Sequence, residues 1–159
     1  MTRIVVTGPP GSGVSLVAAA LAARLHSRSI DGDELHPPIS RGRRARPADV
    51  DHEAWLRAIA LVFTKDAGVV VSSGALSRAD RDRIRGSARD VVFVELVTGT
   101  ATAEPRRRRW RRETPLPPRP VDPLTADEAG VRIADDADLG SVVERIHAAL
   151  AGAPSQSLR

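Results

Sequence analysis

The residues whose types and spacing best suit chemistry lie near the amino terminus, in a glycine-rich segment between an apolar run and an alanine-rich run. The segment reads Gly8-Pro9-Pro10-Gly11-Ser12-Gly13-Val14-Ser15, and it fits the phosphate-binding pattern G-x-x-x-x-G-K-[ST] except at the lysine position. In such a loop the glycines let consecutive backbone N–H groups surround phosphate oxygens, and the helix that follows contributes its positive end. We therefore predict that residues 8–15 bind a nucleoside phosphate and that the Ser15 hydroxyl coordinates Mg²⁺.

Val14 stands where this pattern has its lysine. The lysine normally follows the transferring phosphate and offsets the charge that develops there, and valine can do neither. Removal of one well-placed charge donor costs on the order of 3 kcal/mol in the transition state, or about a hundredfold in rate. Lys65 is the only lysine of the chain and falls on a different predicted helix, so it is a poor substitute. We expect the backbone to keep binding an anion while phosphoryl transfer is weakened.

A second chemical segment follows a short predicted strand that ends at Ile30. It reads Asp31-Gly32-Asp33-Glu34-Leu35-His36-Pro37. Open α/β sheets place ligand-binding groups at the carboxyl ends of their strands. One carboxylate could hold Mg²⁺ through water, and the other could accept a proton from a substrate hydroxyl. On composition alone, the segment reads equally well as an acidic surface turn.

With this segment, the sequence resembles the gluconokinase family, whose members use ATP to phosphorylate gluconate at its terminal hydroxyl. Residues 31–37 match the family segment D-G-D-x-L-H-P throughout, after a phosphate loop at the family's distance. Residues 49–56 are similar to the family stretch D-x-D-R-x-P-W-L, with His52 and Ala54 departing from it. Residues 74–85 resemble S-A-L-K-x-x-Y-R-D-x-L-R, and the likeness covers roughly residues 3–150.

The resemblance implies ATP and Mg²⁺ as cofactors and a sugar acid as the phosphoryl acceptor. It places Asp31 near Mg²⁺ and makes Asp33 the base that faces the acceptor hydroxyl. It also implies that His36 lines the substrate pocket and that Arg81 contacts substrate or phosphate. Gluconokinases are often dimers, so a homodimer is a candidate state.

An arginine-dense run over residues 104–112 corresponds by position to the start of the lid that folds over the phosphates in these kinases. Within it, Arg107 and Arg111 best fit the lid arginines that stabilise charge during transfer. Its position favours the lid over a solvated face, and a contact for nucleic acid or another polyanion is the third alternative. Trp110 could shield the nucleotide or pack against the sheet.

The departures from the family pattern bear on a single step, the transfer of the phosphoryl group. Val14 replaces the loop lysine, Ser77 replaces a second lysine, and the lid is shortened around residues 104–123. A lid excludes water and completes the charge clamp. Two functions therefore stay open: phosphotransfer from ATP to gluconate or a related polyol, with weakened activity, and a catalytically inactive pseudokinase that binds a nucleotide or phosphoanion.

The alternation of apolar runs predicts a three-layer α/β P-loop fold with five parallel strands in the order 2-3-1-4-5. Strands are expected at residues 3–7, up to Ile30, at 69–71, 91–97 and 131–134. A first helix is expected at residues 15–26, with Leu16, Ala19, Ala20 and Ala23 on one face. A second should run from an Asp51 N-cap to Asp66, with Trp55, Ile59, Val62 and Phe63 on one face. Two more are expected at residues 77–85 and from Leu139 to Leu150. Residues 1–151 would form one domain, residues 36–48 an irregular, mobile segment, and residues 152–159 a flexible tail.

Composition excludes several classes of protein. The chain has 159 residues, a net charge of +4 and no cysteine, which excludes disulfides and thiolate zinc sites. Aromatic residues make up only 3%, which argues against base-stacking platforms for RNA or single-stranded DNA. No apolar run approaches the roughly 20 residues that span a bilayer, and the start lacks signal-peptide features, so the cytoplasm is the expected location. His26, His52 and His147 are predicted to be surface residues.

Overall fold

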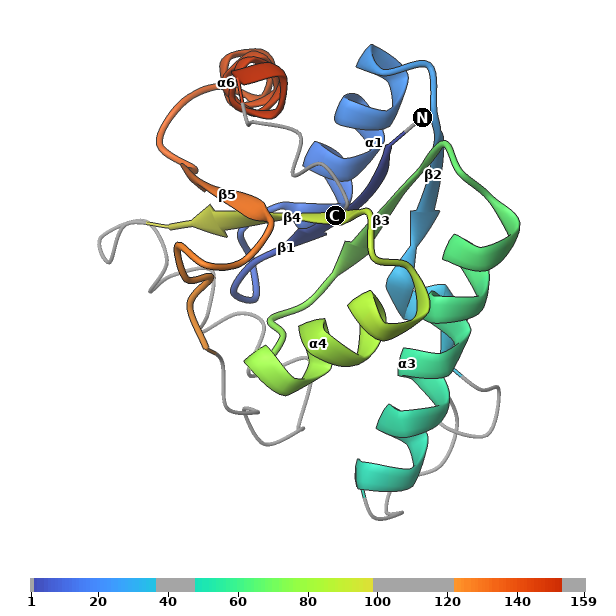
Figure 1. Ribbon diagram of the computed structural model, residues 1–159. Coiled ribbons are helices and arrows are strands. Elements are labelled where there is room, and N and C mark those ends of the chain that lie inside the picture. Colours follow the sequence, from blue (N-terminus) through green and yellow to red (C-terminus); the bar gives the residue numbers. More distant parts are fainter. Residues whose placement is uncertain (1, 37–47, 99–121, 153–159) are drawn as a thin grey trace.

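The chain folds around a five-stranded parallel sheet in the order β2-β3-β1-β4-β5, which confirms the predicted topology (Figure 1). The structure is a computed structural model that describes residues 2–36, 48–98 and 122–152. The strands are β1 (Arg3–Thr7), β2 (Arg28–Asp31), β3 (Val69–Ser73), β4 (Val91–Val97) and β5 (Gly130–Ala134). Predictions that concern residues 37–47, 99–121 and 153–159, including Arg107, Trp110 and Arg111, lie outside the described residues.

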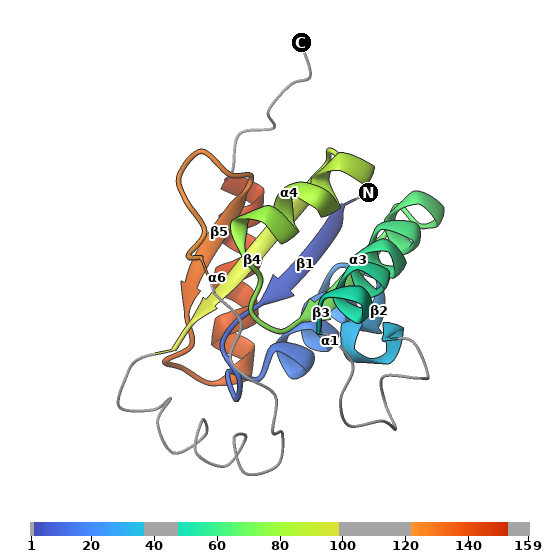
Figure 2. The ribbon, with the colours of Figure 1, turned by 90° about the horizontal axis from the view of Figure 1, so that it is seen from below.

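Helices cover both faces of the sheet, as the alternating pattern predicts (Figures 1 and 2). On one face lie α1 (Val14–Arg24) and α6 (Leu139–Gly152). On the other face lie α3 (Ala48–Lys65) and α4 (Arg78–Ser87), and a short 3₁₀ helix, η1 (Gly32–Leu35), follows β2. None of the described helices is both long and apolar enough to cross a lipid bilayer.

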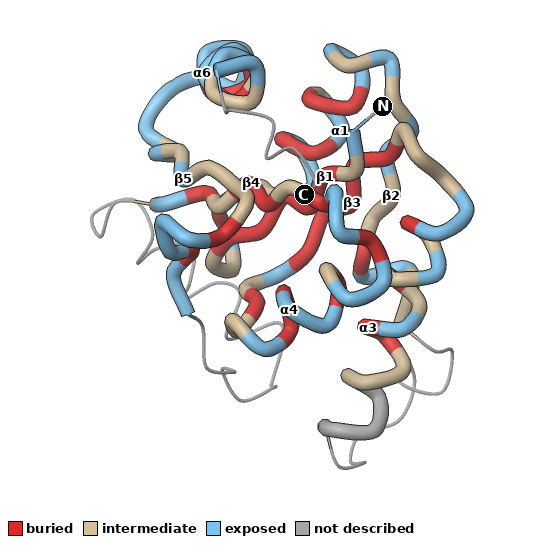
Figure 3. The backbone as a smooth tube through the Cα atoms, viewed as in Figure 1, coloured by how far each residue is buried: buried red, intermediate tan, exposed pale blue. Residues whose placement is uncertain are grey.

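Alternate side chains of each central strand enter two different apolar cores. Ile4 and Val6 of β1 face α1 and α6, whereas Val5 faces α3 and α4. All three are fully buried, which explains why the strand reads as a continuous β-branched run (Figure 3). Trp55, Ile59 and Phe63 of α3 are buried on the predicted face, and Val62 packs against them.

Three local predictions are wrong. Helix α3 begins at Ala48, so Asp51 lies inside the helix and cannot be its N-cap. The buried face of α1 consists of Val17, Ala18, Leu21 and Ala22, whereas Leu16 is 69% exposed. Alanine occurs all around this helix, so its sequence offers little contrast between the two faces. His52 is not a surface residue; its contacts are described with the site.

The carboxyl ends of the parallel strands meet at one edge of the sheet. The phosphate-loop segment follows β1 there, and the acidic segment follows β2. In the sheet β3 lies between these two strands, with Thr7 paired with Ser73 and Asp31 with Ser72. The two chemical segments are therefore held on the same edge by hydrogen-bonded strands.

Candidate phosphate and acceptor site

The loop after β1 has the backbone of an anion-binding turn. Gly11 and Gly13 have φ angles of 82° and 75°, a backbone region that residues other than glycine rarely adopt. The Ser12 N–H donates to the Pro9 carbonyl at 3.1 Å, which closes the turn. Helix α1 then begins with Gly13 as an N-cap that supplies no side-chain bond, and its first turn has no acidic residue. The positive end of the helix is thus left for an external anion.

The Ser12 hydroxyl provides independent support for a ligand at this loop. Ser12 is only 2% exposed, and its Oγ has no hydrogen-bond partner among the described residues. The Oγ lies against Gly8, where an added Cβ would approach it to 2.6 Å. A buried hydroxyl without a partner costs free energy, and a phosphate oxygen would satisfy it. The loop therefore fits a phosphate group.

Val14 places an apolar group where the usual lysine would bring a charge. Its side chain is half-buried and packs against the core between the sheet and helices α1 and α6. It also lies close to Gly8, since a Cβ added there would meet Val14 Cγ1 at 3.2 Å. Ser15 is exposed, so its hydroxyl is accessible to a metal ion.

The acidic turn is fixed to β3 by its first two residues. Asp31 Oδ1 accepts hydrogen bonds from the Asp33 N–H at 3.0 Å and from Ser72 Oγ at 3.2 Å. At Gly32, an added Cβ would lie 2.2 Å from the Ser72 carbonyl oxygen, so only glycine allows this approach. These contacts orient the Asp31 carboxylate, the candidate ligand of Mg²⁺.

Asp33 has an unusual carboxyl group. The residue as a whole is exposed, yet protein atoms surround its carboxyl closely enough that desolvation raises its pKa above the ordinary value. The neighbouring Asp31 charge raises the pKa further, and His36 opposes this effect. A raised pKa favours proton uptake, as a general base requires.

His36 and Trp55 lie together beside the acidic turn. Their rings stack with centroids 5.1 Å apart and an interplanar angle of 6°. Trp55 is 5% exposed and donates its indole N–H to the Gly32 carbonyl at 2.6 Å. Trp55 therefore anchors α3 in the core and also holds the acidic turn.

His52 is the residue of this region that sequence reasoning misses. Its side chain is 14% exposed, its Nε2 lies 2.8 Å from Asp80 Oδ1, and its ring stacks on Trp55. The one available signal is its place three residues before Trp55, which puts both side chains on the same side of a helix.

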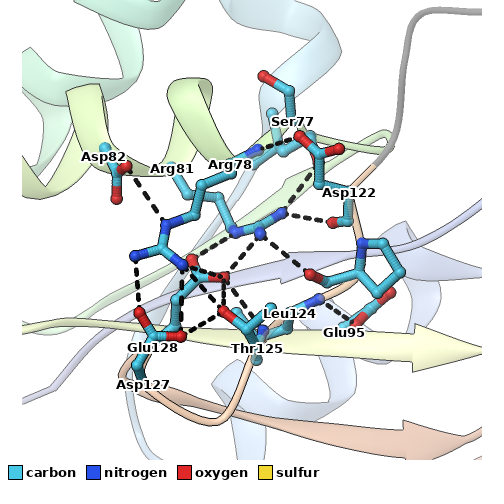
Figure 4. A network of polar contacts seen from close by, with 12 residues as sticks. Ser77, Arg78, Arg81, Asp82, Glu95, Asp122, Leu124, Thr125, Asp127 and Glu128 are labelled. Carbon is cyan, nitrogen blue, oxygen red and sulfur yellow. Dashed lines mark hydrogen bonds and ion pairs between the residues drawn. The ribbon is translucent and has the colours of Figure 1, made fainter.

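Arg81, predicted to contact substrate or phosphate, is occupied by the protein itself (Figure 4). It is 2% exposed, and its guanidinium bonds both carboxylate oxygens of Glu128, at 2.8 and 2.7 Å. Its remaining N–H groups donate to the carbonyl oxygens of Leu76, Asp122 and Pro123. Since all five donors are used, we assign Arg81 a structural role in place of the predicted contact.

The Arg81–Glu128 pair is the centre of a larger ionic network that ties α4 to the segment leading into β5 (Figure 4). Arg85 also donates to Glu128, at 2.8 Å. Burial alone would raise the pKa of Glu128, but hydrogen bonds from Arg81 and Arg85 hold it well below its usual range. Arg78 pairs with Asp127 at 2.9 Å, and hydrogen bonds from Arg78 and Thr125 lower the pKa of Asp127 to about 2.

A small pocket opens beside the phosphate loop. Its lining includes Thr7, Gly8 and Pro9 together with Glu95 of β4. Glu95 accepts hydrogen bonds from the Leu124 N–H at 2.9 Å and from Arg132 Nε at 2.8 Å. The Glu95 carboxylate is thus held by one backbone N–H and one arginine of the protein itself.

Comparisons with known proteins show what the fold and the sequence are similar to. No protein-family model matches the chain. A crystal structure of a gluconokinase from Sinorhizobium meliloti 1021 is 31% identical, with a TM-score of 0.74, and the match covers 94% of this chain and 91% of that one. A shikimate kinase from Aquifex aeolicus has a TM-score of 0.67 at 17% identity and covers 95% of this chain and 97% of that one, which shows the shared P-loop kinase fold.

Curated relatives agree over a shorter span. A gluconokinase from Gluconobacter oxydans is 33% identical over 105 residues, and the thermoresistant gluconokinase of Escherichia coli is 35% identical over 100 residues. These matches cover 61% and 58% of this chain, and 58% and 57% of the relatives' lengths. The near-complete match to the Sinorhizobium structure, at 31% identity, shows that this chain belongs to the gluconokinase family.

Proposed function

We propose that this protein transfers the γ-phosphoryl group of ATP to gluconate or a related sugar acid, at a reduced rate. One observation supports this most strongly: the phosphate loop, whose Ser12 hydroxyl has no hydrogen-bond partner in the described part of the chain, lies on the same edge of the sheet as the turn that carries Asp31, Asp33 and His36. The relatives from Gluconobacter oxydans and Sinorhizobium meliloti are gluconokinases, which supports the same class of acceptor for this protein.

The loop residues would bind the nucleotide. Backbone N–H groups at the start of α1 and the Ser12 hydroxyl would donate to the phosphate oxygens. Ser15 and Asp31 would hold Mg²⁺, which would supply positive charge beside the phosphates. The Asp31 carboxylate suits this role because its two hydrogen bonds fix its orientation.

The acidic turn would bind and activate the acceptor. Asp33 would take the proton of the attacking hydroxyl as the oxygen bonds to the γ-phosphorus and ADP leaves. Its raised pKa supports this role. His36 would line the acceptor pocket, with its ring held against Trp55.

Val14 supports a second candidate, a protein that binds a nucleotide or phosphoanion without transferring a phosphoryl group. The half-buried valine side chain packs against the apolar core and carries no charge, so nothing at position 14 can follow the moving charge. Arg107 and Arg111, outside the described residues, remain the candidates for supplying that charge from the lid.

A sugar-acid panel separates the two candidates. ADP release would be measured for the natural protein, for Val14→Lys, and for Val14→Met as a control that adds length without charge. Gluconate-dependent turnover in the natural protein, increased in Val14→Lys but not in Val14→Met, supports the kinase. ATP binding without turnover in all three proteins would instead support the phosphoanion-binding candidate.

A further inference from the structure

We propose that His52 is a positioning residue for the acceptor half of the site: held by Asp80, its ring clamps Trp55 against the turn at residues 32–36. This inference rests on the proposed function for its kinetic consequence, but its structural content can be tested without turnover. His52 departs from the arginine that the resembled family stretch carries at this place.

Asp80, which holds His52, is itself immobilised. Its Oδ2 accepts the Ser77 N–H at 3.1 Å, and its own N–H donates to Ser77 Oγ at 3.2 Å, which forms a capping box at the start of α4. Asp80 is 8% exposed. Its remaining oxygen, Oδ1, meets His52 Nε2 at 2.8 Å.

The charge on Asp80 determines which atom of the contact with His52 carries the hydrogen. Burial would raise the pKa of Asp80, but hydrogen bonds from His52 and Ser77 lower it below its ordinary value. Asp80 is therefore ionised near neutral pH and can only accept hydrogen bonds. The His52 Nε2 must then carry the hydrogen, so the contact fixes both the position and the orientation of the ring.

The Trp55 indole connects His52 to the acidic turn. The His52 ring lies 5.3 Å from the Trp55 ring at 29°, and the His36 ring lies 5.1 Å from it at 6°. The Trp55 indole N–H donates to the Gly32 carbonyl at 2.6 Å. One side chain therefore holds both the main chain of the turn and the ring of His36, and His52 limits where that side chain can lie.

None of the contacts just described between Asp80, His52, Trp55 and the acidic turn involves the phosphate loop. The loop follows β1 and opens α1, whereas His52 acts through α3, α4 and η1. Loss of the clamp should accordingly impair use of the acceptor and leave use of ATP nearly unchanged.

The test combines two readouts in a Trp110→Phe background, which leaves Trp55 as the only tryptophan because the chain has two. Hydrogen exchange of the Trp55 indole N–H, followed by ¹H–¹⁵N NMR, reports the bond to Gly32 in the ligand-free protein. Steady-state kinetics give separate KM values for gluconate and for ATP. The control is Arg57→Ala, which removes a 74% exposed side chain from the same helix.

Three variants separate the ring stack from general stability. His52→Ala removes the ring and its hydrogen bond, His52→Gln keeps a donor for Asp80 without the ring, and His52→Phe keeps the ring without the donor. We expect His52→Ala and His52→Gln to raise the indole exchange rate and the KM for gluconate by about three- to tenfold, the range for loss of one aromatic pair. We expect His52→Phe to remain closer to the natural protein in both readouts despite a lower melting temperature.

Two results would overturn the inference: indole exchange that follows the melting temperature rather than the presence of the ring, or a KM for ATP that rises as much as the KM for gluconate. If the natural protein shows no gluconate-dependent turnover, the proposed function fails, and the exchange data alone decide the role of His52. Unchanged exchange in both His52→Ala and His52→Gln would then reject the clamp.

Discussion

The buried hydroxyl of Ser12 lies against Gly8, so closely that a Cβ added to that glycine would come within 2.6 Å of the Ser12 Oγ. The hydroxyl has no partner among the described residues, although Ser12 is almost completely buried. The loop thus retains a polar atom at a free-energy cost that a bound phosphate would offset.

Ser12→Ala is therefore expected to affect stability and binding in opposite directions. Without ligand, the variant should be as stable as the natural protein, or more stable by up to about 1–3 kcal/mol, because an unsatisfied buried hydroxyl is removed. ATP binding should weaken by roughly tenfold, the loss of one charge-assisted hydrogen bond. Urea unfolding and isothermal titration with ATP measure the two effects. A variant that is destabilised and still binds ATP fully would contradict this role for Ser12.

Gly32→Ala should disrupt the acidic turn. The new methyl group would lie 2.2 Å from the Ser72 carbonyl oxygen, and backbone must move to accept it. We expect a loss of about 1–3 kcal/mol in the free energy of unfolding, the usual cost of overpacking. Gly86→Ala is the matched control, because nothing lies near an added Cβ there and alanine favours the helix. Equal stability of the two variants in urea would show that the turn is not packed as described.

The buried Glu128 should make stability depend on pH. Its pKa is depressed in the folded protein, so its contribution is present above the ordinary value of 4.5 and is lost as the pH falls below it. Glu128→Gln should lower the free energy of unfolding at pH 7 by about 3–5 kcal/mol, since it leaves Arg81 without a charged partner, and it should flatten the decline between pH 5 and pH 3. Urea unfolding across this range measures both effects. A natural protein whose stability falls no more steeply than that of Glu128→Gln would contradict the buried pair.

Asp33→Asn should block proton transfer and spare the nucleotide site. A general base contributes about 10²- to 10⁴-fold, so gluconate-dependent turnover should fall within that range. The affinity for ATP should stay unchanged, because Asp33 lies beyond β2 and the phosphate loop follows β1. Glu34→Gln, one residue further along the same turn, serves as the control and should keep most of the activity. Similar losses in both variants would reject Asp33 as the base.

Local patterns predicted most of the scaffold. The β-branched runs of β1 and β4 were predicted with the bounds that the structure has, because both faces of a central parallel strand are buried. Ser77 begins α4 through a capping box that acts within four consecutive residues. Where the pattern lacked contrast, as in the alanine-rich α1, the buried face was predicted wrongly.

Site residues that act through distant partners could not be predicted in the same way. Glu128, the partner of Arg81, is 47 residues away in sequence, and Asp80 is 28 residues from His52. No local periodicity records such pairings, which arise only when the sheet brings α3, α4 and the β5 approach together. The phosphate loop and the acidic turn were recognisable because each acts within one short contiguous segment.

The central claim is that residues 8–15 bind the phosphates of a nucleotide without a lysine, and isothermal titration with ATP and Mg²⁺ tests it most directly. The natural protein should bind ATP, and Gly8→Val, whose side chain would collide with Ser12 Oγ and the Leu96 and Val14 side chains, should lose that binding while its circular dichroism stays native. Absence of binding by the folded natural protein, or equal binding by Gly8→Val, would contradict the account.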